Sequence, residues 1–363
     1  MRERLAVFYD ERVLEHDTGR GFFETAASPY LVHREPHPEN RLRLENMVAV
    51  LREGPIAAAL DWRRAPAATR QDLERFHDPA YIDELASIPR HETRVMSSTT
   101  VFGPNSFELC RIAAGQAIAA ADHAFAGNGI AYALVRPPGH HAQPAMADGY
   151  CFINNIGVAI ERLRSRGLER AAVIDWDVHH GNGTQAGFYA DPKVLTISLH
   201  MPHGAWGETH PQSGDFDERG EGAGLGKNLN LPLPCGSGNV AYARVFDEIV
   251  APAVRAHAPE VLLVACGQDA SQFDPNGRQL LTMAGFYDLG RRARALADEC
   301  CAGRLVLVQE GGYQPSYAAY CLHATLDGVL AREPGLADPI AFMPESTAGL
   351  DAFIDIARRA PRG

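Results

Sequence analysis

Six short apolar segments, separated by longer amphipathic ones, restrict the fold of this sequence more than any other feature. A strand of a parallel sheet is buried on both faces, so it is almost continuously apolar rather than alternating. Six segments have this character: 5–9, 130–135, 170–176, 194–200, 261–267 and 304–313. The repeated order of strand and helix predicts a doubly wound α/β fold with a mostly parallel central sheet flanked by helices.

The segments between these strands carry apolar residues at helical spacing. They predict helices over residues 38–51, 106–125, 154–163, 240–257, 280–301 and 317–330. The tail from about Asp351 is rich in alanine and arginine and predicts either a closing helix or an oligomer contact. The sequence contains no repeat, low-complexity segment or Gly/Ser linker, so we expect residues 1–363 to form a single domain.

Composition and charge exclude several classes of function. Hydrophobic residues make up 46% and charged residues 22%, as in soluble globular proteins and unlike disordered or fibrous ones. With 45 acidic and 34 basic side chains the net charge is −11, which argues against a nucleic-acid partner. No apolar run approaches the roughly 20 residues of a membrane span, and the first residues do not resemble a signal peptide. The seven scattered cysteines predict reduced thiols in a cytoplasmic protein.

Potential metal ligands follow two of the predicted strands. The segment DWDVHHGNGT at 175–184 comes directly after the strand RAAVI, and its alternation can bring Asp177 and His179 to one cation. Asp269 follows the strand VLLVAC and could be a third ligand. Two carboxylates and one imidazole suit zinc, iron or another divalent ion and leave a position open for water. The alternatives are a polar turn before a helix at 175–184 and a helix N-cap at Asp269.

Two further strand ends carry groups suited to acid–base chemistry. In RPPGHH, two prolines and a glycine fix the backbone before the adjacent imidazoles of His140 and His141. In QEGGY, two glycines allow the hydroxyl of Tyr313 to reach the strand-end face, where it could donate to an oxyanion. Taken singly, these segments could equally be a surface loop with incidental histidines and a glycine turn before a packing tyrosine.

Together these segments resemble the zinc-dependent histone deacetylase family, in particular its class II members and the bacterial histone deacetylase-like amidohydrolases. The matching motifs run in order along most of the chain: HPENR, FHDPAYI, RPPGHHA, GYCFINN, DWDVHHGNGTQ, TISLH and EGGY. The resemblance implies an arginase-like α/β domain. It also implies hydrolysis of acetyl or other small acyl groups from amines by a metal-activated water.

The resemblance assigns a role to each catalytic position. One catalytic Zn²⁺ would be bound by Asp177, His179 and Asp269. In the tandem pair, His141 would be the general base and acid, and His140 would be oriented by Asp175. Asn182, where class I members carry Asp, would face His141, and Tyr313 would hold the substrate carbonyl. A structural K⁺ would lie beside the zinc, at the positions of Asp175, Asp177, His179, Ser198 and Leu199.

The resemblance also suggests how substrate is bound. Phe152 would form one wall of a narrow acyl-lysine tunnel, and Gly149 would line its inner part. Asn276 would lie at the tunnel mouth, where histone deacetylase-like enzymes often carry Leu and a polyamine deacetylase relative carries Glu, so it argues weakly against a polyamine substrate. Trp206, in the unusual loop 201–212, would form the opposite wall or pack the loop. His203 and His210 in this loop would be rim residues.

Several alternatives remain open at this level. The candidate substrates are an acylated lysine, an acetylated polyamine and another small amide. The acylated lysine and the small amide are favoured, because Asn276 argues weakly against the polyamine. Ureohydrolysis of the arginase type needs a binuclear site with more carboxylates, and a noncatalytic acyl-lysine binder would not need both histidines and Tyr313. Bacterial relatives are often dimers or tetramers, which makes a homo-oligomer possible here. Gln268 stands where an aromatic residue is usual in the family.

Overall fold

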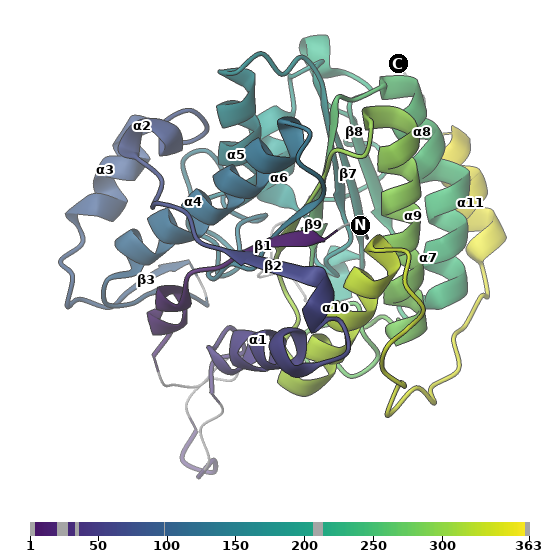
Figure 1. Ribbon diagram of the computed structural model, residues 1–363, viewed down its shortest axis with the longest axis horizontal. Helices are drawn as coiled ribbons and strands as arrows, with labels where there is room; N and C mark the ends of the chain where they lie inside the picture. Colours follow the sequence, from purple (N-terminus) through teal and green to yellow (C-terminus); the bar gives the residue numbers. More distant parts are fainter. Residues whose placement is uncertain (1–3, 20–27, 33–35, 98, 206–212, 360–363) are drawn as a thin grey trace.

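The computed structural model describes residues 4–19, 28–32, 36–97, 99–205 and 213–359. Within these residues, eight parallel strands form one sheet in the order β2-β1-β5-β10-β9-β6-β7-β8 (Figure 1). The strands are β1 (Leu5–Phe8), β2 (Leu60–Arg63), β5 (Ala131–Ala133), β6 (Ala171–Asp175), β7 (Val194–His200), β8 (Asn228–Pro232), β9 (Val261–Cys266) and β10 (Leu305–Gln309). A separate antiparallel pair consists of β3 (Arg94–Ser97) and β4 (Thr100–Phe102).

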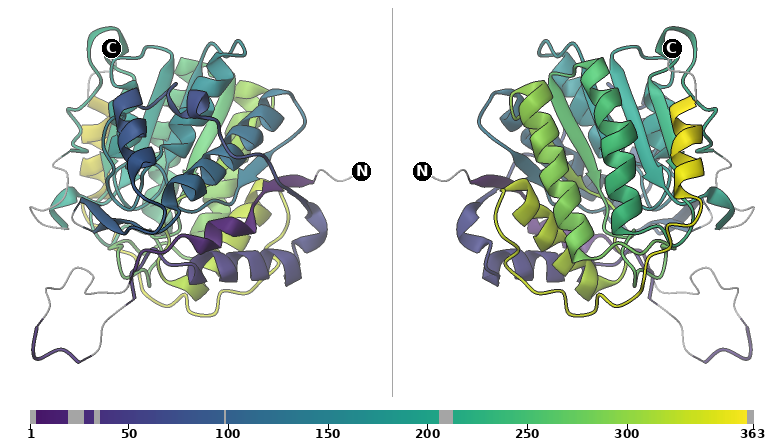
Figure 2. Two further views of the ribbon diagram at one scale, coloured as in Figure 1. Left: turned by 90° about the vertical axis from the view of Figure 1, so that its left-hand side faces the viewer. Right: turned by 90° about the vertical axis from the view of Figure 1, so that its right-hand side faces the viewer.

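Alternate side chains of each strand enter two hydrophobic cores, one on each face of the sheet. In β1, Leu5 and Val7 belong to one core, whereas Ala6 and Phe8 belong to the other. The first core is closed by α1, α7, α8, α9, α10 and α11, and the second by α4, α5 and α6; Figure 2 shows α9 and α11 over the first face. Both faces are covered, which explains why the strands are continuously apolar.

The helices have the following bounds. They are α1 (Leu42–Glu53), α2 (Arg70–Leu73), α3 (Pro79–Ser87), α4 (Ser106–Phe125), α5 (Asn155–Arg164), α6 (Asn182–Phe188), α7 (Asn239–Val245), α8 (Ala251–His257), α9 (Met283–Cys301), α10 (Pro315–Val329) and α11 (Leu350–Arg359). Among the described residues, none of the helices has both the length and the hydrophobicity needed to cross a bilayer.

The predicted fold class is confirmed, with differences at the edges. All six predicted strands are present, but β2 and β8 were not predicted because their sequences, LDWR and NLNLP, mix polar and apolar residues. The helix predicted from residue 38 begins at Leu42, and the one predicted over 240–257 contains a π-helical turn at Phe246–Val250. The C-terminal tail forms the closing helix α11, whose Phe353 packs against Phe216 with ring centroids 5.2 Å apart.

Candidate active site

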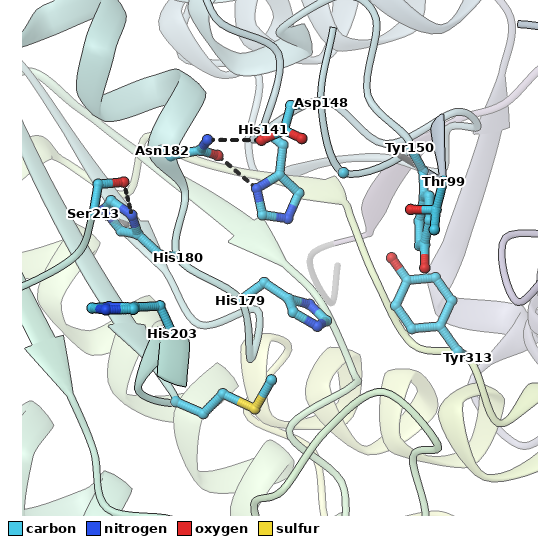
Figure 3. Close-up of a pocket in the computed structure, with 12 residues that line it drawn as sticks. Thr99, His141, Asp148, Tyr150, His179, His180, Asn182, His203, Ser213 and Tyr313 are labelled. Atoms are coloured by element: carbon cyan, nitrogen blue, oxygen red, sulfur yellow. Dashed lines mark hydrogen bonds between the residues drawn. The ribbon is translucent and has the colours of Figure 1, made fainter. Parts of the chain in front are cut away.

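The predicted reactive residues meet at the carboxyl edge of the sheet. They lie in the loops that follow β5, β6, β9 and β10. These four strands are adjacent in the sheet, in the order β5-β10-β9-β6. In open α/β sheets this edge is where ligands bind. Figure 3 shows His141, His179 and Tyr313 around one pocket, although they come from three separate loops.

Asp177, His179 and Asp269 form a group that could hold a metal ion. Their ligand atoms all lie within 4.8 Å of one another. Nδ1 of His179 is 3.0 Å from Oδ1 of Asp177 and 3.2 Å from Oδ2 of Asp269. Oδ2 of Asp269 is buried and accepts no hydrogen bond in the described part of the chain. An unpartnered carboxylate oxygen facing an imidazole nitrogen is the arrangement that a bound cation would complete.

The charges in this group also favour a cation. Burial and the neighbouring carboxylate of Asp177 raise the pKa of Asp269 to about 7. Burial lowers the pKa of His179, but the adjacent carboxylates of Asp177 and Asp269 outweigh this effect and raise it to about 10. The two carboxylates therefore stabilise a positive charge between them, either a proton on His179 or a metal ion.

Backbone donors hold the two carboxylates in place. The amide of Gly311 donates to Oδ2 of Asp177 at 2.7 Å, and the amide of Val178 donates to Oδ1 of Asp269 at 2.8 Å. A Cβ on Gly311 would lie 1.9 Å from Oδ2 of Asp269, so this position must be glycine. The first glycine after Glu310 is therefore required by the close approach of the backbone to the two carboxylates.

His140 is held by two acidic side chains. Its Nδ1 lies 2.9 Å from Oδ2 of Asp175, as predicted. The carboxylate of Glu310 accepts hydrogen bonds from the amides of Gly139, at 2.6 Å, and His140, at 3.1 Å. Burial lowers the pKa of His140, but Asp175 and Asp177 more than compensate and raise it well above its ordinary value. This histidine therefore favours its protonated form.

His141 lies in a different environment. Its Nδ1 is 2.7 Å from the side-chain oxygen of Asn182, as predicted, and the amide nitrogen of Asn182 donates to Oδ2 of Asp148 at 3.0 Å (Figure 3). Burial, followed by the nearby His140 and His179, lowers the pKa of His141 well below its ordinary value. The tandem pair thus contains one histidine that holds a proton and one that is neutral.

Twelve residues line the pocket, and only five of them were predicted as site residues. The predicted ones are His141, Gly149, His179, Asn182 and Tyr313; the others are Thr99, Asp148, Tyr150, His180, Met201, His203 and Ser213. His203, expected at the rim, is part of the lining. His210 lies outside the described residues, as does Trp206, so its predicted position as a tunnel wall stays a prediction.

The prediction that Phe152 forms a tunnel wall is wrong. Its side chain is fully buried in the core beside β4 and packs edge-on against Phe102, with ring centroids 5.1 Å apart. Tyr150, two residues earlier, lines the pocket instead, and its ring meets that of Tyr313 edge-on at 5.6 Å. Both Gly149 and Tyr150 have positive φ angles, 49° and 69°. The prediction for Phe152 came from the family resemblance, and residues 150 and 152 would share one side of a regular strand, so it is this turn that decides which ring faces the pocket.

Asn276 lies behind the pocket wall and is not one of the residues that line the pocket. It is buried, and its amide nitrogen donates to the hydroxyl of Tyr150 at 3.3 Å. The predicted position at the mouth is therefore not observed, and Asn276 instead positions Tyr150. Gln268, noted as a departure from the family pattern, is buried and accepts a hydrogen bond from Gln309 at 2.8 Å.

Of the five residues predicted to hold potassium, Asp175 and Ser198 line a smaller cavity, whereas Asp177, His179 and Leu199 are not in its lining. Asp175 on β6 is in register with Ser198 on β7, and both line this cavity. The amide of Gly181 lies 3.4 Å from the hydroxyl of Ser198. The side chain of Leu199 points into the hydrophobic core, which leaves only its backbone for a ligand role.

Comparisons with known proteins agree with this geometry. Residues 37–329 match the family model described as a histone deacetylase domain. The chain is 49% identical to histone deacetylase 8 of Arabidopsis thaliana, over 97% of this chain and 95% of that protein. It is 37% identical to a histone deacetylase-like amidohydrolase of Pseudomonas aeruginosa, over 99% and 94%.

A solved structure has the same fold. The crystal structure of the HDA15 HD domain superposes with a TM-score of 0.84 at 31% identity, covering 99% of this chain and 95% of that one. The family match spans the three candidate metal ligands, the tandem histidines and Tyr313. The chain therefore belongs to the histone deacetylase family and is an amide hydrolase of the deacetylase and amidohydrolase type.

Proposed function

We propose that this protein is a zinc-dependent deacylase that removes acetyl or other small acyl groups from acylated lysine or from a small amide. The observation that carries the proposal is the group of Asp177, His179 and Asp269, whose His179 lines the same pocket as His141 and Tyr313. When bound, Zn²⁺ would supply a Lewis acid that polarises the amide carbonyl and acidifies a water. The remaining chemistry belongs to the protein side chains.

His141 is suited to be the general base. Its Nδ1 is occupied by Asn182, which leaves Nε2 as the nitrogen free to take a proton. Because the pKa of His141 is lowered well below its ordinary value, chiefly by burial, the ring is neutral at physiological pH and can accept the proton of an attacking water. The same ring can return the proton to the departing amine.

His140 and Tyr313 stabilise the charge that develops. The protonated ring of His140, paired with Asp175, places a positive charge beside His141, which keeps that ring neutral until the attacking water gives up its proton. The hydroxyl of Tyr313 donates a hydrogen bond to the oxyanion that forms on the substrate carbonyl. Burial raises the pKa of Tyr313 well above its ordinary value, so the hydroxyl keeps its proton.

The walls of the pocket support a slender acyl chain. The ring of Tyr150 stands edge-on to Tyr313 and restricts the width of the pocket beside the metal-binding group. Acetylpolyamine hydrolysis is the second candidate, and the carboxylate of Asp148 in the lining is the observation that favours a cationic amine. With Asn276 away from the lining, its neutral side chain no longer argues against this candidate.

Further parts of the proposal concern the surroundings of the site. A structural K⁺ would lie near Asp175 and Ser198, beside the zinc. All seven cysteines are unpaired, which supports a reducing compartment such as the cytoplasm. The oligomeric state, as a monomer, dimer or tetramer, can be measured on the same preparation by sedimentation.

The experiment compares kcat/KM for an acetyl-lysine tripeptide and for N-acetylputrescine, with and without a chelator, while metal content is measured. We expect zinc at about one ion per chain and turnover that stops on chelation and returns with added Zn²⁺. The variant Asp269→Asn should lose metal and activity, whereas Asp355→Asn, which removes an exposed carboxylate on α11, should keep both. Iron instead of zinc, or turnover that survives complete metal removal, would contradict the proposal.

A further inference from the structure

We propose that Asp148 is a positioning residue that fixes the amide of Asn182 and, through it, the proton position on His141. The proposal rests on the role of His141 as general base. Asp148 was not among the predicted site residues, because nothing in the segment AMADGY distinguishes this acid from a surface residue.

The three side chains form a continuous chain of hydrogen bonds. His141 Nδ1 lies 2.7 Å from the oxygen of Asn182, and the nitrogen of Asn182 lies 3.0 Å from Oδ2 of Asp148. Asn182 is 6% exposed and Asp148 is 9% exposed, so water has little access to substitute for either bond. In Figure 3 dashed lines join the side chain of Asn182 both to Asp148 and to the ring of His141.

Asp148 is itself held firmly. Its amide donates to the carbonyl of Cys151 at 3.1 Å, and the amide of Cys151 donates back to the carbonyl of Asp148 at 2.7 Å. This reciprocal pair closes the tight turn that contains Gly149 and Tyr150. The carboxylate is thus presented from a fixed backbone rather than from a flexible loop.

The direction of each hydrogen bond follows from the chemistry of the carboxylate. An ionised carboxylate only accepts hydrogen bonds, so Asn182 must turn its NH₂ group toward Asp148 and its oxygen toward His141. An amide oxygen also only accepts, so the neutral ring of His141 must carry its proton on Nδ1. The basic lone pair is then on Nε2, which is the nitrogen that a general base needs on the pocket side.

Without the carboxylate this order would not be enforced. The amide of Asn182 could rotate by half a turn and present its NH₂ group to Nδ1 of His141 with little change in shape. The ring would then carry its proton on Nε2 and could not accept one from water. Members with Asp in place of Asn182 would avoid this problem directly, because a carboxylate beside the ring has no donor to present.

The decisive test exchanges the two side chains. In the Asp148→Asn variant the new amide can pair with Asn182 in either direction, so kcat should fall roughly tenfold with KM nearly unchanged, as a charge-assisted hydrogen bond is lost. In the double variant Asp148→Asn with Asn182→Asp, the carboxylate at position 182 accepts from both His141 and the new amide. We expect this exchange to recover kcat to within about threefold of the parent protein. Asn182→Asp alone would place two carboxylates about 3 Å apart and should be less active than the exchange.

The proton position is read independently of turnover. Long-range ¹H–¹⁵N spectra of the zinc-loaded protein distinguish the two neutral forms of an imidazole. His141 should be entirely in the Nδ1–H form in the parent and the exchanged variant, and mixed in Asp148→Asn. If the parent protein had no deacylase activity, the proposed function would be refuted, but the spectra would still show whether Asp148 determines the proton position on His141.

Two results would overturn the inference. One is an Asp148→Asn variant that keeps both the parent kcat and a pure Nδ1–H form of His141. The other is an exchanged variant that is no more active than the single variants. Should Asp148→Asn fail to fold, as judged by thermal unfolding, the exchanged variant still decides the question, because it restores every hydrogen bond of the chain.

Discussion

The guanidinium of Arg43 lies over the ring of Tyr313, with its central carbon 4.6 Å from the ring centroid. Arg43 also donates to the backbone carbonyls of Gly312, at 2.6 Å, and Glu310, at 2.5 Å, so it binds both the ring and the backbone of the EGGY segment. The residue is buried and comes from α1, far from Tyr313 in sequence. Arg43 therefore fixes the orientation of the hydroxyl that we assign to the oxyanion.

Replacing Tyr313 by phenylalanine should lower kcat by roughly 10²-fold or more. The change removes one hydroxyl from a buried position and leaves the ring to stack with Arg43, so the fold should be retained. The loss is of the size found when one oxyanion donor is removed. Tyr320→Phe on α10 removes a hydroxyl outside the pocket and is the control. Steady-state kinetics with equal kcat for both variants would remove Tyr313 from the mechanism.

Replacing Arg43 by leucine should destabilise the protein by about 3–5 kcal/mol, because it leaves a buried carboxylate with fewer partners. The side chain of Glu39 accepts from Arg43 at 3.0 Å and from Arg136 at 2.7 Å, and all three residues are buried. Urea unfolding measures the loss. Arg41→Leu, which removes a mostly exposed arginine two residues earlier, should change stability by less than about 1 kcal/mol. Equal effects of the two substitutions would contradict the importance of the buried network.

Replacing Gly149 by alanine should reduce kcat at least tenfold. A Cβ at this position would lie 2.2 Å from Cδ2 of His141, so the ring of the general base would have to move. The backbone is also in the left-handed region, with φ at 49°. Gly127→Ala is a matched control, since φ is 77° there and no atom lies within 4 Å of the new Cβ. It should show a similar backbone strain with unchanged kcat. Identical kinetics for the two variants would show that contact with His141 is unimportant.

The central strands and the residues at their ends could be predicted from the sequence for one physical reason. Strands buried on both faces are continuously apolar, and polar residues directly after them must lie at the carboxyl edge of the sheet. Asp177, Asp269 and Tyr313 were found in this way, and the structure brings the first two within reach of one cation. Strands β2 and β8 were not predicted. They lie at the two edges of the sheet, where each has a neighbouring strand on one side only, and their sequences mix polar and apolar residues.

Other parts of the site depend on contacts between distant segments. The buried network of Glu39, Arg43 and Arg136 joins two segments, because Glu39 and Arg43 are close in the sequence whereas Arg136 lies 97 residues after Glu39. Phe152 was assigned from the family resemblance, and Tyr150 was missed because only the turn at Gly149 and Tyr150, both with positive φ, decides which of the two rings faces the pocket. Asp148 was missed because its role appears only when Asn182 and His141 are seen beside it.

Lowering the pH from about 6.5 to 4 should destabilise the protein partly through His77, which lies between α2 and α3. Its Nδ1 lies 3.1 Å from the carbonyl of Gln143 and 3.2 Å from that of Pro144, and its Nε2 accepts from the amide of Asn154 at 2.9 Å. A protonated ring could not accept this last bond. Burial lowers the pKa of His77 from 6.5 to about 4, despite the opposing effect of the two carbonyls.

The sign of the effect follows from proton binding. Between pH 6.5 and 4 the unfolded chain binds a proton at this histidine and the folded chain does not, so stability falls as the pH is lowered through this range. The contribution of His77 is at most about 3 kcal/mol. His77→Gln cannot take up the proton, so its free energy of unfolding should depend less steeply on pH than that of the parent. Urea unfolding at several pH values measures the difference, with the exposed His91→Gln as the control, which should keep the parent slope. If all three proteins show the same slope, His77 is not a source of the acid sensitivity.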